Sequence, residues 1–132
     1  MVKEIIDSIF PISQNAFKTI EAFLEYENFE KGDLFIQEDH RNEKEYFVLE
    51  GVCNSYLINP EGEEITISFF TDNSILSPYT TRTNNSFSIL NFKALTQLKL
   101  ASVNAKVFED LMVRNVEIRN FGNAVLQNEL MK

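Results

Sequence analysis

The chain has 132 residues, a single cysteine and a formal net charge of −8. This length fits one domain, which can bury about two-thirds of its unfolded surface and needs no disulfide. The acidic charge argues against DNA binding by this chain alone, because affinity for DNA comes largely from cationic side chains. The first ten residues contain no apolar run typical of a signal peptide, and no segment approaches the roughly 20 apolar residues of a membrane span. We therefore expect a cytoplasmic protein without a membrane partner.

The first predicted element is an amphipathic helix within a helical N-terminal part, residues 1–25. Ser13 is a suitable N-cap, and Phe17, Ile20 and Leu24 recur at helical spacing. The pattern predicts a helix of about three turns with its aromatic side chains in the core.

Residues 26–101 have the pattern of several short strands. From Tyr26 the apolar period changes toward two, and runs rich in aromatic and β-branched residues alternate with turn-like segments. The predicted strands are residues 34–38, 45–51, 52–58, 64–70, 86–92 and 94–100. Pro60 and Gly62 in the segment NPEGEE predict a hairpin. Many short strands at regular spacing indicate a sandwich or barrel.

Residues 102–132 return to a helical period. Ser102 or Asn104 can cap a helix that contains Phe108 and Leu111. In the helical segment that follows, Gly122 costs about 1 kcal/mol relative to alanine, which a closely approaching neighbour would explain.

The last helical segment has an apolar stripe at the end of the chain. Its positions are Val116, Phe121, Val125 or Leu126, and Leu130. Because little chain remains for this stripe to pack against, we predict that it contacts a partner subunit.

Candidate catalytic residues are sparse. The only histidine, His40, lies in a charged turn, and one histidine with one distant cysteine cannot form a typical zinc or iron site. Glu61, Glu63 and Glu64 crowd the predicted hairpin turn and are interpreted as solvated rather than as an acid–base pair. Cys53 is interpreted as a small buried apolar residue. We expect neither enzyme activity nor a bound metal; the alternative, a cupin-like metal enzyme, would need clustered histidines.

Four features occur in order between residues 29 and 70. They are a Lys-Gly-Asp segment at 31–33, the run EYFVLEG ending at Gly51, the hairpin segment NPEGEE, and the aromatic strand ISFF. In this combination the chain resembles the cyclic nucleotide-binding domain of the catabolite-activator/fumarate-nitrate-type (Crp/Fnr) bacterial transcription regulators. The flanking helical segments extend the resemblance from about Phe10 to the end of the chain.

The resemblance implies a mainly β fold with flanking helices. The expected architecture is a β jelly roll, or double-stranded β-helix, with an N-terminal helix and a C-terminal dimerisation helix, all in one domain over residues 1–132. The family also implies a homodimer, a small effector and a DNA-binding helix-turn-helix lobe. That lobe would have to follow Lys132, so DNA is expected as a partner only through it.

In ligand-binding members of the family, a short cassette holds the cyclic phosphate. It contains Phe-Gly-Glu, a loop, and then Arg-Ser/Thr-Ala, which supply backbone amides, a carboxylate and a cation. Here the resemblance places Asn73 at a usual turn glycine, and Leu76, Ser77 and Pro78 on Phe-Gly-Glu. Proline offers neither a backbone donor nor a carboxylate. Ser88 falls near the usual arginine, a change that costs about 1–3 kcal/mol for an anionic ligand.

Arg82 lies about six residues before that position and is the alternative anion-binding group. The candidate ligand-binding residues of this degenerate cassette are Ser77, Pro78, Tyr79, Arg82, Ser88 and Ile89. We therefore predict the ligand-sensing domain of a transcription regulator that signals through its C-terminal helix. A bound cyclic nucleotide is disfavoured, and no other cofactor is assigned. The remaining alternative is a dimerisation module without a small ligand.

Overall fold

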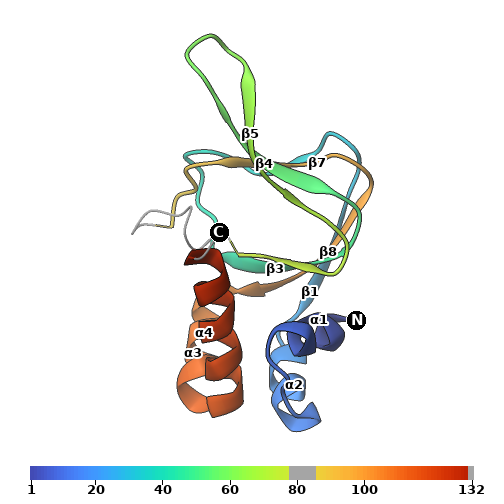
Figure 1. Ribbon diagram of the computed structural model, residues 1–132, viewed down its shortest axis with the longest axis vertical. Helices are drawn as coiled ribbons and strands as arrows, with labels where there is room; N and C mark the ends of the chain where they lie inside the picture. The colour runs from blue at the N-terminus through green and yellow to red at the C-terminus, as the bar shows by residue number, and fades with distance from the viewer. Residues whose placement is uncertain (78–85, 131–132) are drawn as a thin grey trace.

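Two antiparallel sheets face each other, and helices cover the outer face of one of them (Figure 1). The computed structural model describes residues 1–77 and 86–130, with residues 129 and 130 described by their backbone only. Within these residues, eight strands form the two sheets. The first sheet has the order β1 (Glu25–Phe29), β8 (Leu98–Asn104), β3 (Lys44–Glu50), β6 (Ser74–Leu76). The second has the order β2 (Leu34–Ile36), β7 (Asn91–Ala94), β4 (Cys53–Ile58), β5 (Glu64–Phe70).

The first sheet is covered on both faces. Along β3, Tyr46 and Val48 point into the core between the sheets, whereas Phe47 points into a second core shared with the helices. Successive side chains of a strand point to opposite faces. Both faces of β3 are therefore apolar, which explains why YFVL, residues 46–49, is a continuous apolar run rather than an alternating one.

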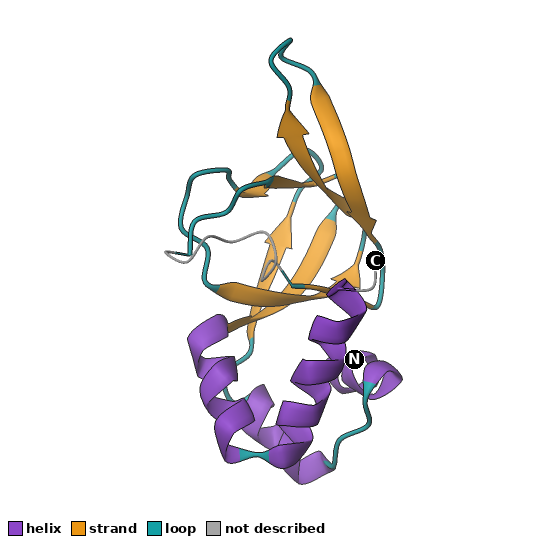
Figure 2. Cartoon of the chain, turned by 60° about the vertical axis from the view of Figure 1, so that its left-hand side comes forward, coloured by secondary structure: helices purple, strands orange, loops and turns teal. Residues whose placement is uncertain are grey.

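In the described part of the chain, four helices lie on the outer face of the first sheet, as Figure 2 illustrates. They are α1 (Val2–Ile9), α2 (Gln14–Glu21), α3 (Ala105–Arg114) and α4 (Val116–Leu130). The Ser13 hydroxyl caps α2 by accepting a bond from the amide of Ala16 at 3.1 Å, as predicted. Helix α2 has 8 residues, about two turns and not three, because the chain turns into β1 directly after it. Helix α1 was not predicted separately.

Several predicted strand boundaries are wrong. Strand β7 begins at Asn91, five residues later than predicted, because residues 86–90 bond to a turn instead of a sheet. Strand β6 is not among the predicted strands; Asn73, at φ 62°, comes directly before it, and the next three residues pair with β3. Strand β8 continues to Asn104, so Asn104 and not Ser102 caps α3.

The predicted hairpin is confirmed. Strands β4 and β5 are joined through NPEGEE, with Gly62 at φ 83° and the amide of Asn59 bonded to the carbonyl of Glu63 at 2.9 Å. The tip of this hairpin extends beyond the two sheets, at the opposite end of the molecule from the helices (Figure 1).

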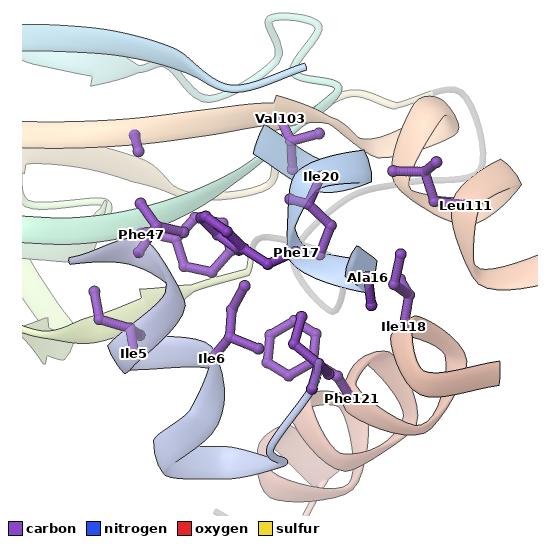
Figure 3. Close-up of a cluster of buried hydrophobic side chains, with 13 residues drawn as sticks. Ile5, Ile6, Ala16, Phe17, Ile20, Phe47, Val103, Leu111, Ile118 and Phe121 are labelled. Atoms are coloured by element: carbon purple, nitrogen blue, oxygen red, sulfur yellow. The ribbon is translucent and has the colours of Figure 1, made fainter. Parts of the chain in front are cut away.

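The core under the helices joins the ends of the chain to the sheet. Side chains from α1, α2, α3 and α4 converge with Phe47 and Val103 of the first sheet (Figure 3). Phe121 of α4 is 2% exposed and packs edge-to-face on Phe108 of α3, with ring centroids 6.0 Å apart. This packing fixes the position of α4 on the jelly roll.

Candidate functional site

The described part of the cassette begins at strand β6. Asn73 adopts the left-handed conformation that usually favours glycine, and its amide donates to the carbonyl of Val48 at 2.8 Å. Asparagine tolerates this conformation better than most residues, so it can occupy the position of the family's turn glycine. Ser77 follows β6 and is half-buried.

The returning segment, residues 86–90, is attached to the charged turn that contains His40. The amide of Ser88 donates to the carbonyl of His40 at 3.0 Å, and the amide of Asp39 donates to the carbonyl of Ser88 at 2.8 Å. The amide of Asn42 donates to the carbonyl of Ser86 at 2.8 Å. These bonds place the segment beside the turn and hold its backbone there.

Ser88 is the residue that the sequence analysis placed near the arginine of the cassette. It is fully buried, and its Oγ donates to the carbonyl of Leu90 at 2.6 Å. The hydroxyl proton is therefore used within the chain rather than presented to a ligand. The neighbouring Ile89 is 51% exposed and offers only an apolar surface.

Three of the predicted cassette residues, Pro78, Tyr79 and Arg82, lie outside the described residues. A cation that the sequence did not single out, Arg41, lies beside the returning segment. Its guanidinium is 5.3 Å from the ring centroid of Phe87 and 3.2 Å from a carboxylate oxygen of Glu43. The isolated bridge between Arg41 and Phe87 produces this proximity, and no local sequence pattern indicates it.

The predicted dimerisation residues fall into different environments. Val116 is 59% exposed at the start of α4, whereas Phe121 is buried in the chain's own core. Val125 and Leu126 are half-buried, and the side chain of Leu130 lies outside the described residues. In this chain, Val116 is thus more accessible to a partner than the other described members of the stripe.

A pocket of about 210 Å³ lies between the first sheet and helices α3 and α4. Its apolar lining includes Phe47, Ile75, Phe108, Met112 and Val125. It is on the outer face of the sheet, whereas the interior of the jelly roll is on the inner face. The sequence did not predict it, because the lining comes from strands and helices that are distant along the chain.

The predicted close neighbour of Gly122 is present in this pocket. A Cβ at this position would lie 2.7 Å from the sulfur of Met112 and 3.3 Å from the ring of Phe108. Glycine therefore lets α3 and α4 approach each other closely where both line the pocket.

Hydrogen bonds also join the start of α4 to Ser13, the N-cap of α2. The carboxylate of Glu117 accepts from the backbone amide of Ser13 at 2.7 Å and from its hydroxyl at 2.8 Å. This contact places a carboxylate at the N-terminus of α2, where the helix dipole favours negative charge.

Cys53 is buried between the sheets, as predicted, and desolvation raises the pKa of its thiol to about 12. Among the residues that the structure describes, no three His, Cys, Asp or Glu side chains form a group that could hold a metal ion. Over the same residues, no helix combines the length and apolarity needed to cross a membrane.

A comparison with protein-family models shows which family this chain belongs to. The family described as cyclic nucleotide-binding domain matches residues 26–115, more than half of the chain. The chain belongs to the cyclic nucleotide-binding domain family. A comparison with curated proteins finds no match.

Solved structures show the same fold. The sensor domain of the transcriptional regulator DNR from Pseudomonas aeruginosa is 15% identical, with a TM-score of 0.78 over 96% of this chain and 83% of that one. A cyclic nucleotide-binding domain from Methylobacillus flagellatus is 14% identical, with a TM-score of 0.83 over 98% of this chain and 74% of that one.

The catabolite activator protein of Thermus thermophilus is 12% identical, with a TM-score of 0.75 over 91% of this chain. This chain covers 56% of the length of that protein. The chain therefore has the same cyclic nucleotide-binding fold as these three proteins.

Proposed function

We propose that this domain is the sensor of a bacterial transcription regulator whose cassette no longer holds a cyclic nucleotide. The two sheets of the cyclic nucleotide-binding fold form the sensing part, and the helices on their outer face transmit the signal. In this proposal the domain acts by binding and not by catalysis, and its output is a change in the position or stability of α4.

The observation that carries the proposal is the environment of Ser88. A cyclic phosphate needs a cation at this position, and Ser88 is neutral, fully buried and bonded to its own backbone. The loss of about 1–3 kcal/mol from this change weakens binding roughly 5- to 150-fold.

The packing of α4 supports its role in signalling. Phe121 attaches the helix to the core under the sheet, and Glu117 attaches its start to the N-terminal part. A ligand shifts such a helix only by the difference in its affinity for the two positions of the helix. Because β6 and β3 belong to the sheet on which α4 packs, a change at the cassette has a short physical route to the helix.

Isothermal calorimetry with cyclic AMP tests the cassette. Applied to a micromolar site, that loss gives an expected dissociation constant of about 5–150 μM for the unmodified domain. Arg82→Gln should leave this weak binding unchanged. Arg41→Gln is the matched control, because it also removes one cation, here from beside the returning segment, and it should leave binding unchanged as well. Binding tighter than about 5 μM would contradict the proposal, and its loss in Arg82→Gln but not in Arg41→Gln would show that Arg82 restores the anion site.

Exposure of Val116 favours a second role, dimerisation through α4. We propose that Val116→Asp weakens a homodimer measured by sedimentation equilibrium. Ile67→Asp changes an exposed apolar residue on the distant hairpin and should leave the dimer intact. A monomeric unmodified chain at high concentration, or equal dissociation by both variants, would contradict an interface at α4.

A further inference from the structure

The thioether of Met112 lies in the contact between two helices. Helices α3 and α4 run side by side (Figure 1), and Met112 of α3 packs over Gly122 of α4. A Cβ at position 122 would lie 2.7 Å from the sulfur and 2.5 Å from the terminal methyl carbon of Met112. The thioether therefore fills the space that a larger side chain on α4 would need.

The neighbours of this sulfur are apolar. Phe108 precedes Met112 by one helical turn, and its ring would lie 3.3 Å from the same Cβ. Phe108 in turn packs edge-to-face on Phe121. Met112 packs against the core under the helices but is only half-buried, so a small reagent can reach its side chain from solvent. A modification that made the sulfur polar would place a hydrogen-bond acceptor in this apolar contact.

We propose that Met112 is a redox modification site, at which oxidation of the thioether to the sulfoxide loosens α4 from α3. Hydrogen peroxide supplies the oxygen: the sulfur lone pair attacks one peroxide oxygen, an S–O bond forms and the O–O bond breaks. The sulfur loses two electrons, and after proton transfer the other oxygen leaves as water. Methionine sulfoxide reductases, one for each epimer of the sulfoxide, reverse the reaction with a thiol as the reductant.

The expected effect of the added oxygen is local to the second half of α4. The sulfoxide is polar and larger than the thioether, and the thioether already fills the space above Gly122. The start of α4 is held separately, because Phe121 is buried in the core and Glu117 is bonded to Ser13. We therefore expect residues 122–128 to open while the first turns of α4 stay packed.

This inference goes beyond the proposed function and requires no ligand at the cassette. Calorimetry with cyclic AMP can refute the sensor proposal without affecting the assignment of Met112. Conversely, a failure of the Met112 assignment leaves the cassette and its calorimetric test as they are.

Peroxide treatment followed by peptide mass spectrometry and hydrogen exchange tests the proposal. We expect one added oxygen atom on Met112, and exchange at the amides of residues 122–128 at least about fivefold faster than before treatment. Amides of the β4–β5 hairpin, at the opposite end of the molecule, should change by less than about twofold. Incubation of the oxidised protein with both reductases should restore the original exchange rates.

Met112→Leu is the matched control, because leucine has a similar volume and has no sulfur to oxidise. This variant keeps Met1, Met131 and Cys53, so any effect of peroxide at those residues appears in it as well. We expect peroxide to leave its α4 exchange unchanged. Met112→Gln, which carries a neutral polar group permanently, should reproduce the faster exchange without peroxide.

Several results would overturn the proposal. Met112 could stay unoxidised after Met1 is fully oxidised, α4 exchange could stay unchanged after Met112 is oxidised, or Met112→Leu could show the same acceleration as the unmodified chain. Reductase treatment of the unmodified protein keeps the proposal falsifiable if Met112→Leu does not fold. Faster exchange that the reductases do not reverse would also contradict a sulfoxide at Met112 as the cause.

Discussion

Replacement of Phe121 by alanine tests whether α4 belongs to the core of this chain. The side chain is 2% exposed, packs edge-to-face on Phe108 and lies in the cluster under the first sheet. Phenylalanine-to-alanine changes in cores cost about 3–5 kcal/mol, depending on how far the surroundings collapse into the new space. The neighbouring pocket gives Met112 and Phe108 room to move, so we expect the lower end, about 3 kcal/mol.

Urea denaturation followed by circular dichroism measures this loss. For a domain of this size, about 3 kcal/mol corresponds to a fall of roughly 10 °C in Tm. Val116→Ala, on the exposed first turn of the same helix, should change the free energy of unfolding by no more than about 0.5 kcal/mol. The loss of unfolding free energy caused by Phe121→Ala should be the same at two protein concentrations, because the contacts of Phe121 lie within one chain.

Two results would refute the reasoning. A loss below about 1 kcal/mol for Phe121→Ala would mean that α4 is not packed on the sheet in solution. A loss that appears only at high protein concentration would assign Phe121 to a contact between subunits, in which the helix leaves its own domain.

Three further changes test separate parts of the fold. Gly51→Ala should be far more destabilising than Gly62→Ala in urea titrations: both have positive φ, but only at Gly51 does a Cβ collide with the carbonyl of Gln97. The thiol of Cys53 should react with Ellman's reagent only on unfolding. Because burial raises its pKa from 9.0 to about 12, its contribution to stability should be full below pH 9 and lost as the pH rises toward 12. The pKa of Asp7 is lowered, first by a hydrogen bond from a lysine, so its contribution should be present above pH 3.8 and lost at lower pH, and Asp7→Asn should remove this dependence.

Each of these expectations has a contrary result. Equal losses of stability in Gly51→Ala and Gly62→Ala would mean that the positive φ, and not the collision with the carbonyl of Gln97, determines the destabilisation. Rapid thiol modification in native conditions would show that the two sheets separate readily. An acid unfolding profile identical in Asp7→Asn and the unmodified chain would assign acid sensitivity to other carboxylates.

The sequence alone indicated the fold class and the nature of most elements. Ser13 marked the start of α2, Pro60 and Gly62 marked the hairpin, and the order of short aromatic strands supported the jelly roll through its resemblance to the family. These features are local, because a cap or a turn depends on residues within a few positions of one another.

The degenerate cassette is a prediction from the sequence alone, because it concerns which residues are present at positions that the resemblance assigns. The environment of Ser88 could not be predicted in this way, since its burial depends on hydrogen bonds between residues 86–90 and a turn more than forty positions earlier. For the same reason, residues 86–92 were predicted as a strand. Their apolar spacing suits a strand, but the backbone partners at 86–90 come from the turn around His40.

The tertiary structure decided which residues of the C-terminal apolar stripe are exposed and which are buried. Val116 and Phe121 are both apolar and both on α4, and the sequence predicted a subunit contact for each. The structure exposes the first and buries the second against Phe108, because the turn at Asn115 folds α4 back along α3. The pocket has the same origin: its residues come from β3, β6, β8, α3 and α4, and only the packing of helices on a sheet brings them together.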